Sequence, residues 1–160
     1  MSALTGIGCD SHRFAAGRRL ILGGVEIPHE QGLHGHSDAD ALTHAVIDAL
    51  LGAAGLGDIG ERFPDSDERW RDADSMELLE TVVASLAAGG FAIVNVDCTV
   101  VIEAPRLGPH KQAIRARLAT TLGLPEARVN VKATTGEQMG FVGRGEGVAA
   151  LATASLRHAH

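Results

Sequence analysis

Apolar residues in three segments of the chain recur at the 3.6-residue period of a helix. Positions 42, 45, 46, 49 and 50 form the first stripe, and Ser37 with Asp40 provides a capping signal for a helix that begins near Ser37. Positions 78, 79, 82, 83 and 86 form the second stripe, and Asp74 with Glu77 suits the start of that helix. We expect a third helix over residues 109–122.

Four further segments are rich in β-branched residues and partly alternate, which predicts strands. They cover residues 4–10, 20–27, 91–102 and 129–134. Residues 20–27 are expected to form a hairpin because Gly23-Gly24 interrupts them. Residues 148–156 are ambiguous, since their Ala and Leu favour a helix whereas their position after a glycine-rich turn favours a strand.

Strands interleaved with helices predict an α+β (α/β-like) fold in which helices cover one layer of sheet. The 160 residues suit a single domain, which we expect to span residues 1–160. A net charge of −6 argues against a nucleic-acid or anionic-membrane partner, so any site for anions must use metal ions and backbone N–H groups.

The chain has two cysteines, Cys9 and Cys98, and both lie in apolar runs. We expect both side chains in the core. Because the sequence shows neither a disulfide framework nor a secretory signal, we expect the protein in the reducing cytoplasm.

Asp10 and His12 stand two residues apart at the expected end of a strand, so their side chains point to the same face. His44, on the first helix, can complete a set of one carboxylate and two imidazoles, which suits Zn²⁺ with an open fourth position. The spacing alone leaves a second reading open, because Asp-x-His is common by chance and His44 can lie on a helix surface.

Two polar segments are candidates for phosphate binding. His36-Ser37-Asp38 precedes a helix start, where free N–H groups attract phosphate, although plain helix capping explains it equally well. Residues 133–137 place two threonines and a carboxylate after a strand, and this is either a site for phosphate and a divalent cation or an ordinary turn. Arg144, between glycines, is expected to be exposed or paired with an anion.

Short motifs follow one another in a fixed order over residues 5–157. They include G-x-G-x-D-x-H-x-F from Gly6, H-S-D-x-D from His36, G-D-I-G from Gly57, F-P-D-S-D from Phe63, N-V-K-A-T-T from Asn130 and G-F-x-G-R-G-E-G from Gly140. In this order they resemble the 2-C-methyl-D-erythritol 2,4-cyclodiphosphate synthase family.

The resemblance implies a fold and an assembly. The fold is a single mixed four-stranded sheet covered by helices on one face, with a β-hairpin near the N-terminus. Three such sheets pack around the axis of a homotrimer, with each active site between subunits and an axial cavity that can take an isoprenoid diphosphate.

The implied activity is that of a lyase of the non-mevalonate pathway. It converts 4-diphosphocytidyl-2-C-methyl-D-erythritol 2-phosphate into the 2,4-cyclodiphosphate and CMP. Two other classes remain open: a zinc-dependent phosphoester hydrolase that uses the same ligands, and a non-enzymatic zinc-binding scaffold, which needs a fourth ligand.

The resemblance also implies roles for individual residues. Zn²⁺ is held by Asp10, His12 and His44, and a second cation, Mg²⁺ or Mn²⁺, lies near Glu137. His36 and Thr135 are catalytic. Residues expected to contact the substrate or the axial ligand are Asp10, Ser11, His12, His36, Ser37, Asp58, Ile59, Gly60, Phe63, Pro64, Asp65, Ser66, Asp67, Ile102, Glu103, Ala104, Pro105, Arg106, Leu107, Gly108, Thr134, Thr135, Gly136, Glu137, Phe141 and Arg144.

Two loops depart from the family pattern, at Gly136 and at residues 106–108, and both affect the expected cytidine pocket. Asp40, one turn before His44, is either an outer-shell partner of that imidazole or a helix-dipole residue.

Overall fold

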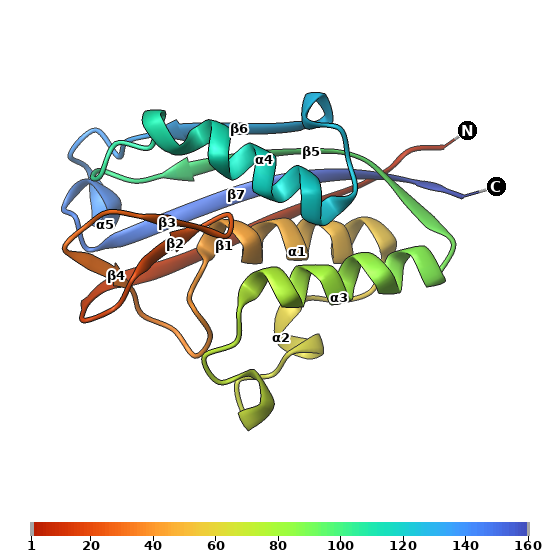
Figure 1. Cartoon of the computed structure of the whole chain (residues 1–160), viewed down its shortest axis with the longest axis horizontal. Helices are drawn as coiled ribbons and strands as arrows, with labels where there is room; N and C mark the ends of the chain where they lie inside the picture. The colour runs from red at the N-terminus through yellow and green to blue at the C-terminus, as the bar shows by residue number, and fades with distance from the viewer. Residues whose placement is uncertain (1, 160) are drawn as a thin grey trace.

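The computed structural model describes residues 2–159, so Met1 and His160 of the expected domain lie outside the described residues. A five-stranded mixed sheet forms the centre, with strand order β4-β1-β7-β5-β6, and a separate two-stranded hairpin joins β2 to β3 (Figure 1). The strands are β1 (Leu4–Ala16), β2 (Leu20–Leu22), β3 (Val25–Ile27), β4 (Gln31–Leu33), β5 (Phe91–Val101), β6 (Val129–Thr134) and β7 (Gly147–His158).

The expected four-stranded sheet is corrected to five strands by the short edge strand β4. Strand β1 continues to Ala16 instead of ending at Asp10, and its last three residues pair antiparallel with Gln31–Leu33. The polar run Asp10–Arg13 hides this extension, because a strand pattern is recognised by its apolar residues. Asp10 and His12 therefore lie within a long strand.

Three long helices, α1 (Ala41–Ala54), α3 (Ser75–Ala88) and α4 (Lys111–Leu122), lie on the same side of the sheet (Figure 1). Shorter helices are α2 (Ile59–Arg62), η1 (Glu68–Trp70), η2 (Gly108–His110), η3 (Glu126–Arg128) and α5 (Gly140–Gly143). The second helix begins after Asp74 as predicted, and the third begins with the 3₁₀ turn η2.

The first helix begins at Ala41, not near Ser37, because Asp40 is its N-cap and accepts a hydrogen bond from the Thr43 N–H. His44 consequently lies in the first turn of α1.

Glycines in β1 let α1 approach the sheet closely. A side chain at Gly8 would collide with the Ala45 carbonyl, and one at Gly6 would collide with the Ala49 carbonyl. Asp10 follows Gly6 and Gly8 on the same face of β1, so the strand brings its carboxylate to the start of α1.

The opposite face of the sheet lacks helices in Figure 1. Apolar side chains are exposed on this face. Residues 148–156 belong to β7, and buried and exposed side chains alternate along it. Ile7 is 69% exposed and Leu151 is 41% exposed on this face. Cys98 is buried as expected, whereas the core prediction for Cys9 is wrong, because Cys9 alternates onto the exposed face. Among residues 2–159, no helix is long and apolar enough to cross a membrane.

Candidate metal centre and active site

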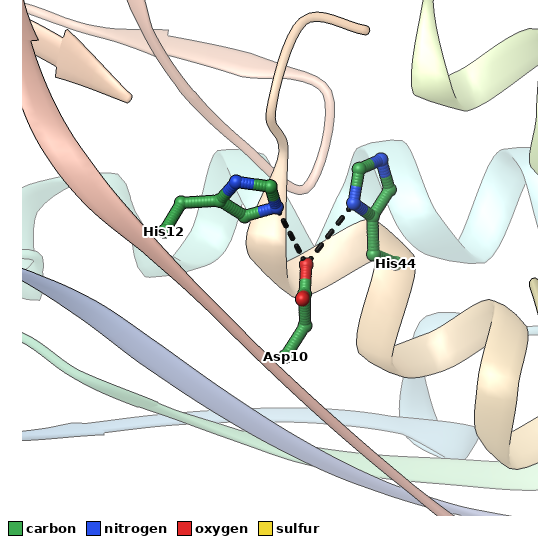
Figure 2. A group of neighbouring side chains, drawn as sticks. All are labelled: Asp10, His12 and His44. Atoms are coloured by element: carbon green, nitrogen blue, oxygen red, sulfur yellow. Dashed lines mark hydrogen bonds and ion pairs between the residues drawn. The ribbon is translucent and has the colours of Figure 1, made fainter. Parts of the chain in front are cut away.

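Asp10, His12 and His44 converge on one point (Figure 2). One potential ligand atom from each lies within 4.8 Å of the others. Asp10 Oδ2 is 2.8 Å from His12 Nε2 and 3.0 Å from His44 Nδ1. Strand β1 supplies two ligands and helix α1 the third.

The hydrogen bonding of His12 shows why a cation fits here. Its Nδ1 lies 2.7 Å from the His34 carbonyl oxygen, which can only accept, so Nδ1 carries the proton. In a neutral ring, Nε2 then presents a lone pair toward the Asp10 carboxylate. Acceptor atoms that face one another need a proton or a metal ion between them, and carboxylate with imidazole is a ligand set for a divalent transition metal.

Without a metal, protons on the imidazoles of His12 and His44 compensate the negative charge of the Asp10 carboxylate. Burial raises the pKa of Asp10, but hydrogen bonds from His12 and His44 outweigh it and lower that pKa to about 2. Burial lowers the pKa of His12, but the hydrogen bond to Asp10, the negative charges of Asp10 and Asp40 and the His34 carbonyl together outweigh it and raise that pKa above its usual value.

The ring nitrogens of His44 hydrogen-bond to Asp10, Ser37 and Ser75, and not to Asp40. The Asp40 carboxylate is fully buried and accepts hydrogen bonds from the N–H groups of Gly23, Gly24 and Thr43. It therefore joins the hairpin turn to α1, and burial raises its pKa. The outer-shell role considered for Asp40 is wrong; the partners of His44 Nε2 are Ser75 Oγ at 2.8 Å and Ser37 Oγ at 3.2 Å.

Arg18 fixes the backbone of the loop that carries His36. The Arg18 guanidinium donates to the carbonyls of Gly35 at 3.2 Å and Ser37 at 2.6 Å, one on each side of His36. The His36 carbonyl accepts from the Asp72 N–H at 2.8 Å. His36 Nδ1 faces Asp65 at 3.9 Å.

A pocket of about 470 Å³ opens above the three ligands. It brings together the predicted residues Asp10, His12, His36, Ser37, His44, Ile59, Gly60, Phe63, Pro64 and Asp65, and adds Gly35, Trp70 and Leu78. Phe63 and Trp70 pack edge to face with ring centroids 5.0 Å apart. The pocket therefore has an apolar side, formed by Phe63 and Trp70, next to the polar cluster of candidate metal ligands.

A second pocket of about 400 Å³ lies between the end of β5 and the end of β6. Its lining includes the predicted residues Ile102, Glu103, Pro105, Arg106, Leu107, Gly108, Thr134 and Thr135. Glu103 accepts hydrogen bonds from the N–H groups of Gly136 and Gln138, at 2.9 and 3.3 Å, and so fixes the turn that carries Thr135.

Sequence comparison identifies the family. The sequence model of the YgbB family matches residues 3–157 of this chain. The chain belongs to the YgbB family. Relatives in this family bear the name expected from the motifs. A 2-C-methyl-D-erythritol 2,4-cyclodiphosphate synthase from Symbiobacterium thermophilum is 58% identical, covering 96% of this chain and 98% of the relative. One from Salinibacter ruber is 56% identical with the same coverage.

Solved structures agree with the YgbB assignment. A 2C-methyl-D-erythritol-2,4-cyclodiphosphate synthase in its CDP-bound form is 38% identical, with a TM-score of 0.88 over 96% of this chain and 99% of that chain. The bifunctional IspDF from Campylobacter jejuni is 47% identical with a TM-score of 0.94, and the match covers 98% of this chain but only 42% of the bifunctional one.

Other predicted residues of this YgbB chain lie outside both pockets. Ser11 and Phe141 line a third hollow of about 220 Å³, and Arg144 pairs within the chain with Glu146 at 3.2 Å. Asp58 caps α2 through the Glu61 N–H, and Asp67 caps η1 through the Arg69 N–H. Ser66, Ala104, Gly136 and Glu137 do not line these pockets.

Sequence reasoning did not assign Arg18, Ser75 or Trp70. An arginine beside a hairpin and a serine after an aspartate give no periodic or motif signal. Both act through partners far along the chain, which only the fold brings close.

Proposed function

We propose that this chain is a 2-C-methyl-D-erythritol 2,4-cyclodiphosphate synthase, a phosphorus–oxygen lyase of the non-mevalonate route of isoprene biosynthesis. It converts 4-diphosphocytidyl-2-C-methyl-D-erythritol 2-phosphate into the cyclodiphosphate and CMP. The 2-phosphate of the substrate attacks the β-phosphorus, and CMP leaves. The observation that carries the proposal is a set of three side chains able to hold a metal ion in one pocket, in a chain 58% identical to a synthase of that name.

The substrate supplies its own nucleophile, so the protein has to position two phosphates and stabilise developing charge. We assign hydrogen-bonding roles toward the phosphates to His36 and Thr135. His36 lines the metal pocket and is fixed by the loop that Arg18 holds. Thr135 lines the second pocket, where Ile102–Gly108 is proposed to hold the cytidine.

Zinc is the proposed ion at Asp10, His12 and His44, because three such ligands with an open position are typical of catalytic zinc. When bound, zinc supplies Lewis-acid stabilisation of phosphate oxygens. A second ion, Mg²⁺ or Mn²⁺, is proposed near Glu137, since hard cations prefer carboxylate and phosphate oxygens.

The proposed assembly is a homotrimer of single domains, residues 1–160, with active sites between subunits. Two observations support it. The metal pocket and the cytidine pocket share no lining residue, so a neighbouring copy can bring them together. The helix-free face of the sheet also exposes Ile7 and Leu151, and this apolar surface suits a subunit interface.

An isoprenoid diphosphate is the proposed ligand of the axial cavity, with Arg144 toward the diphosphate and Phe141, 43% exposed, toward the hydrocarbon. To bind the diphosphate bidentately, Arg144 has to release Glu146. Cys9 and Cys98 are both free, which suits the cytoplasm as the proposed location.

One assay tests the reaction. Purified protein is incubated with the cytidylyl substrate, zinc and Mg²⁺, and the products are followed by ³¹P NMR. The expected products are CMP and a cyclic diphosphate in equal amounts. CMP with an acyclic 2,4-bisphosphate, which has two separate phosphate monoesters and no P–O–P bond, instead indicates a phosphoester hydrolase, and an unchanged substrate indicates a non-enzymatic role.

A further inference from the structure

The second ring nitrogen of His44 points away from the ligand cluster toward the start of α3. His44 Nε2 lies 2.8 Å from the hydroxyl oxygen of Ser75. Ser75 is fully buried and is the first residue of α3. A buried hydroxyl needs hydrogen-bond partners, so the direction in which it donates is fixed by its surroundings.

Asp38 decides that direction. The Ser75 hydroxyl hydrogen-bonds Asp38 Oδ1 at short range. The same carboxylate accepts the Ser75 N–H at 3.0 Å and the Asp40 N–H at 3.1 Å. An ionised carboxylate only accepts, so the single hydroxyl proton of Ser75 is donated to Asp38. Toward His44, the Ser75 oxygen can then only accept.

We propose that Ser75 and Asp38 are positioning residues that fix the tautomer of His44. The chain of donors runs from His44 Nε2–H to Ser75 and from Ser75 O–H to Asp38. His44 Nδ1 is thereby left with its lone pair directed at the ligand cluster, 3.0 Å from Asp10 Oδ2. This inference rests on the metal site of the proposed function and assigns two residues that hold one ligand of it.

The start of α3 does not need the Ser75 hydroxyl for itself. Asp74 is the N-cap, and its carboxylate accepts the Met76 N–H at 2.8 Å. Capping is therefore already provided. Ser37 Oγ, 3.2 Å from His44 Nε2, accepts the Ala39 N–H and is the more distant neighbour of the ring nitrogen.

Asp38 also belongs to the loop of His36, and its N–H donates to the Ala73 carbonyl at 3.1 Å. The loop is thus joined to the start of α3 at Ser75 and to the segment before it at Ala73. Such outer-shell partners orient an imidazole and raise its basicity, and their loss typically weakens metal binding about 10- to 100-fold.

The test measures zinc affinity, by competition between the zinc-loaded protein and a chromophoric chelator. Ser75→Ala and Asp38→Asn are each expected to weaken zinc binding about 10- to 100-fold. Ser75→Thr keeps the hydroxyl and is expected to restore the affinity. Thr81→Ala removes an exposed hydroxyl from the same helix, and Asp74→Asn alters the neighbouring carboxylate, so both should retain wild-type affinity.

A second measurement reads the tautomer directly. In the zinc-loaded wild type, ¹⁵N NMR is expected to show His44 protonated at Nε2 and unprotonated at Nδ1. A proton on Nδ1, or wild-type zinc affinity in both Ser75→Ala and Asp38→Asn, overturns the assignment. If Ser75→Ala does not fold, Asp38→Asn and the wild-type spectrum still decide. If both variants keep wild-type zinc affinity and the wild-type enzyme makes the cyclic product, only this inference is rejected. If the variants lose zinc but the wild-type protein makes no cyclic product, only the proposed reaction is rejected.

Discussion

His44 Nδ1 lies 3.0 Å from Asp10 Oδ2, although 34 positions of sequence separate the two residues. The contact exists because Gly6 and Gly8 let α1 lie close against β1, with its first turn beside Asp10. The proposed metal centre is therefore a product of helix–sheet packing as much as of ligand chemistry.

The first prediction follows from this geometry. His44→Ala removes one of three ligands and is expected to lose most bound zinc and nearly all turnover. The fold should persist, because the His44 side chain lies at the pocket and not in the apolar core. Metal analysis of the purified variant, with circular dichroism as the control for folding, checks this. Full zinc occupancy in His44→Ala would show that the ligand assignment is wrong.

Thr135→Ala is expected to lower kcat much more than it raises KM. A donor that acts mainly on charge developed in the transition state lowers the barrier by about 2.7–4 kcal/mol. Its removal therefore lowers kcat by a factor of about 10²–10³. Steady-state kinetics separate the two constants. If KM rises and kcat stays at the wild-type value, Thr135 binds the ground state only.

Arg18→Ala is expected to reduce turnover without removing the metal. Arg18 fixes the carbonyls on both sides of His36, and hydrogen bonds to a charged group contribute about 1.5–3 kcal/mol each. Arg19→Ala is the matched control, since Arg19 is exposed and its 3.5 Å contact with Glu26 is solvated. Equal activities for the two variants would contradict the role given to Arg18.

The sequence predicts the helices and the central strands well, because α1, α3, β5 and β6 carry clear apolar periods. It fails where polar residues continue an element or where a turn shifts a boundary. The site behaves in the same way: Asp10 and His12 are readable as a pair on one face, but other residues reach the site only through tertiary packing. Ser75, at the start of α3, contacts His44, and Arg18 holds the loop of His36.

The metal-free protein is expected to be most stable between roughly pH 4 and pH 6.5 as far as Asp10 and His12 are concerned. The pKa of Asp10 is lowered from 3.8 to about 2, so its contribution is present above pH 3.8 and is lost as the pH falls toward 2. The pKa of His12 is raised from 6.5, so its contribution is present below pH 6.5 and is lost as the pH rises past the raised value.

Urea unfolding of the chelator-treated protein across this range tests the prediction. Saturating zinc is expected to remove the loss at high pH, because the metal binds the neutral imidazole. Asp10→Asn should flatten both limbs of the metal-free profile. A wild-type profile that is already flat would contradict the pairing of Asp10 with His12.

The last prediction concerns the helix-free face of the sheet. Leu151, at the centre of β7, and Leu56, just after α1, are both 41% exposed, so they differ in location and not in accessibility. If three sheets pack face to face, Leu151→Asp buries a charge in the interface at a cost that an apolar contact cannot offset. Leu151→Asp is expected to sediment as a monomer and lose turnover, because each active site then lacks its neighbour. Leu56→Asp should sediment like the wild type, at three times the chain mass. Sedimentation velocity with all three proteins at one concentration distinguishes these outcomes. A trimeric Leu151→Asp would place the interface elsewhere, and a fully active monomer would show that one chain contains a complete active site.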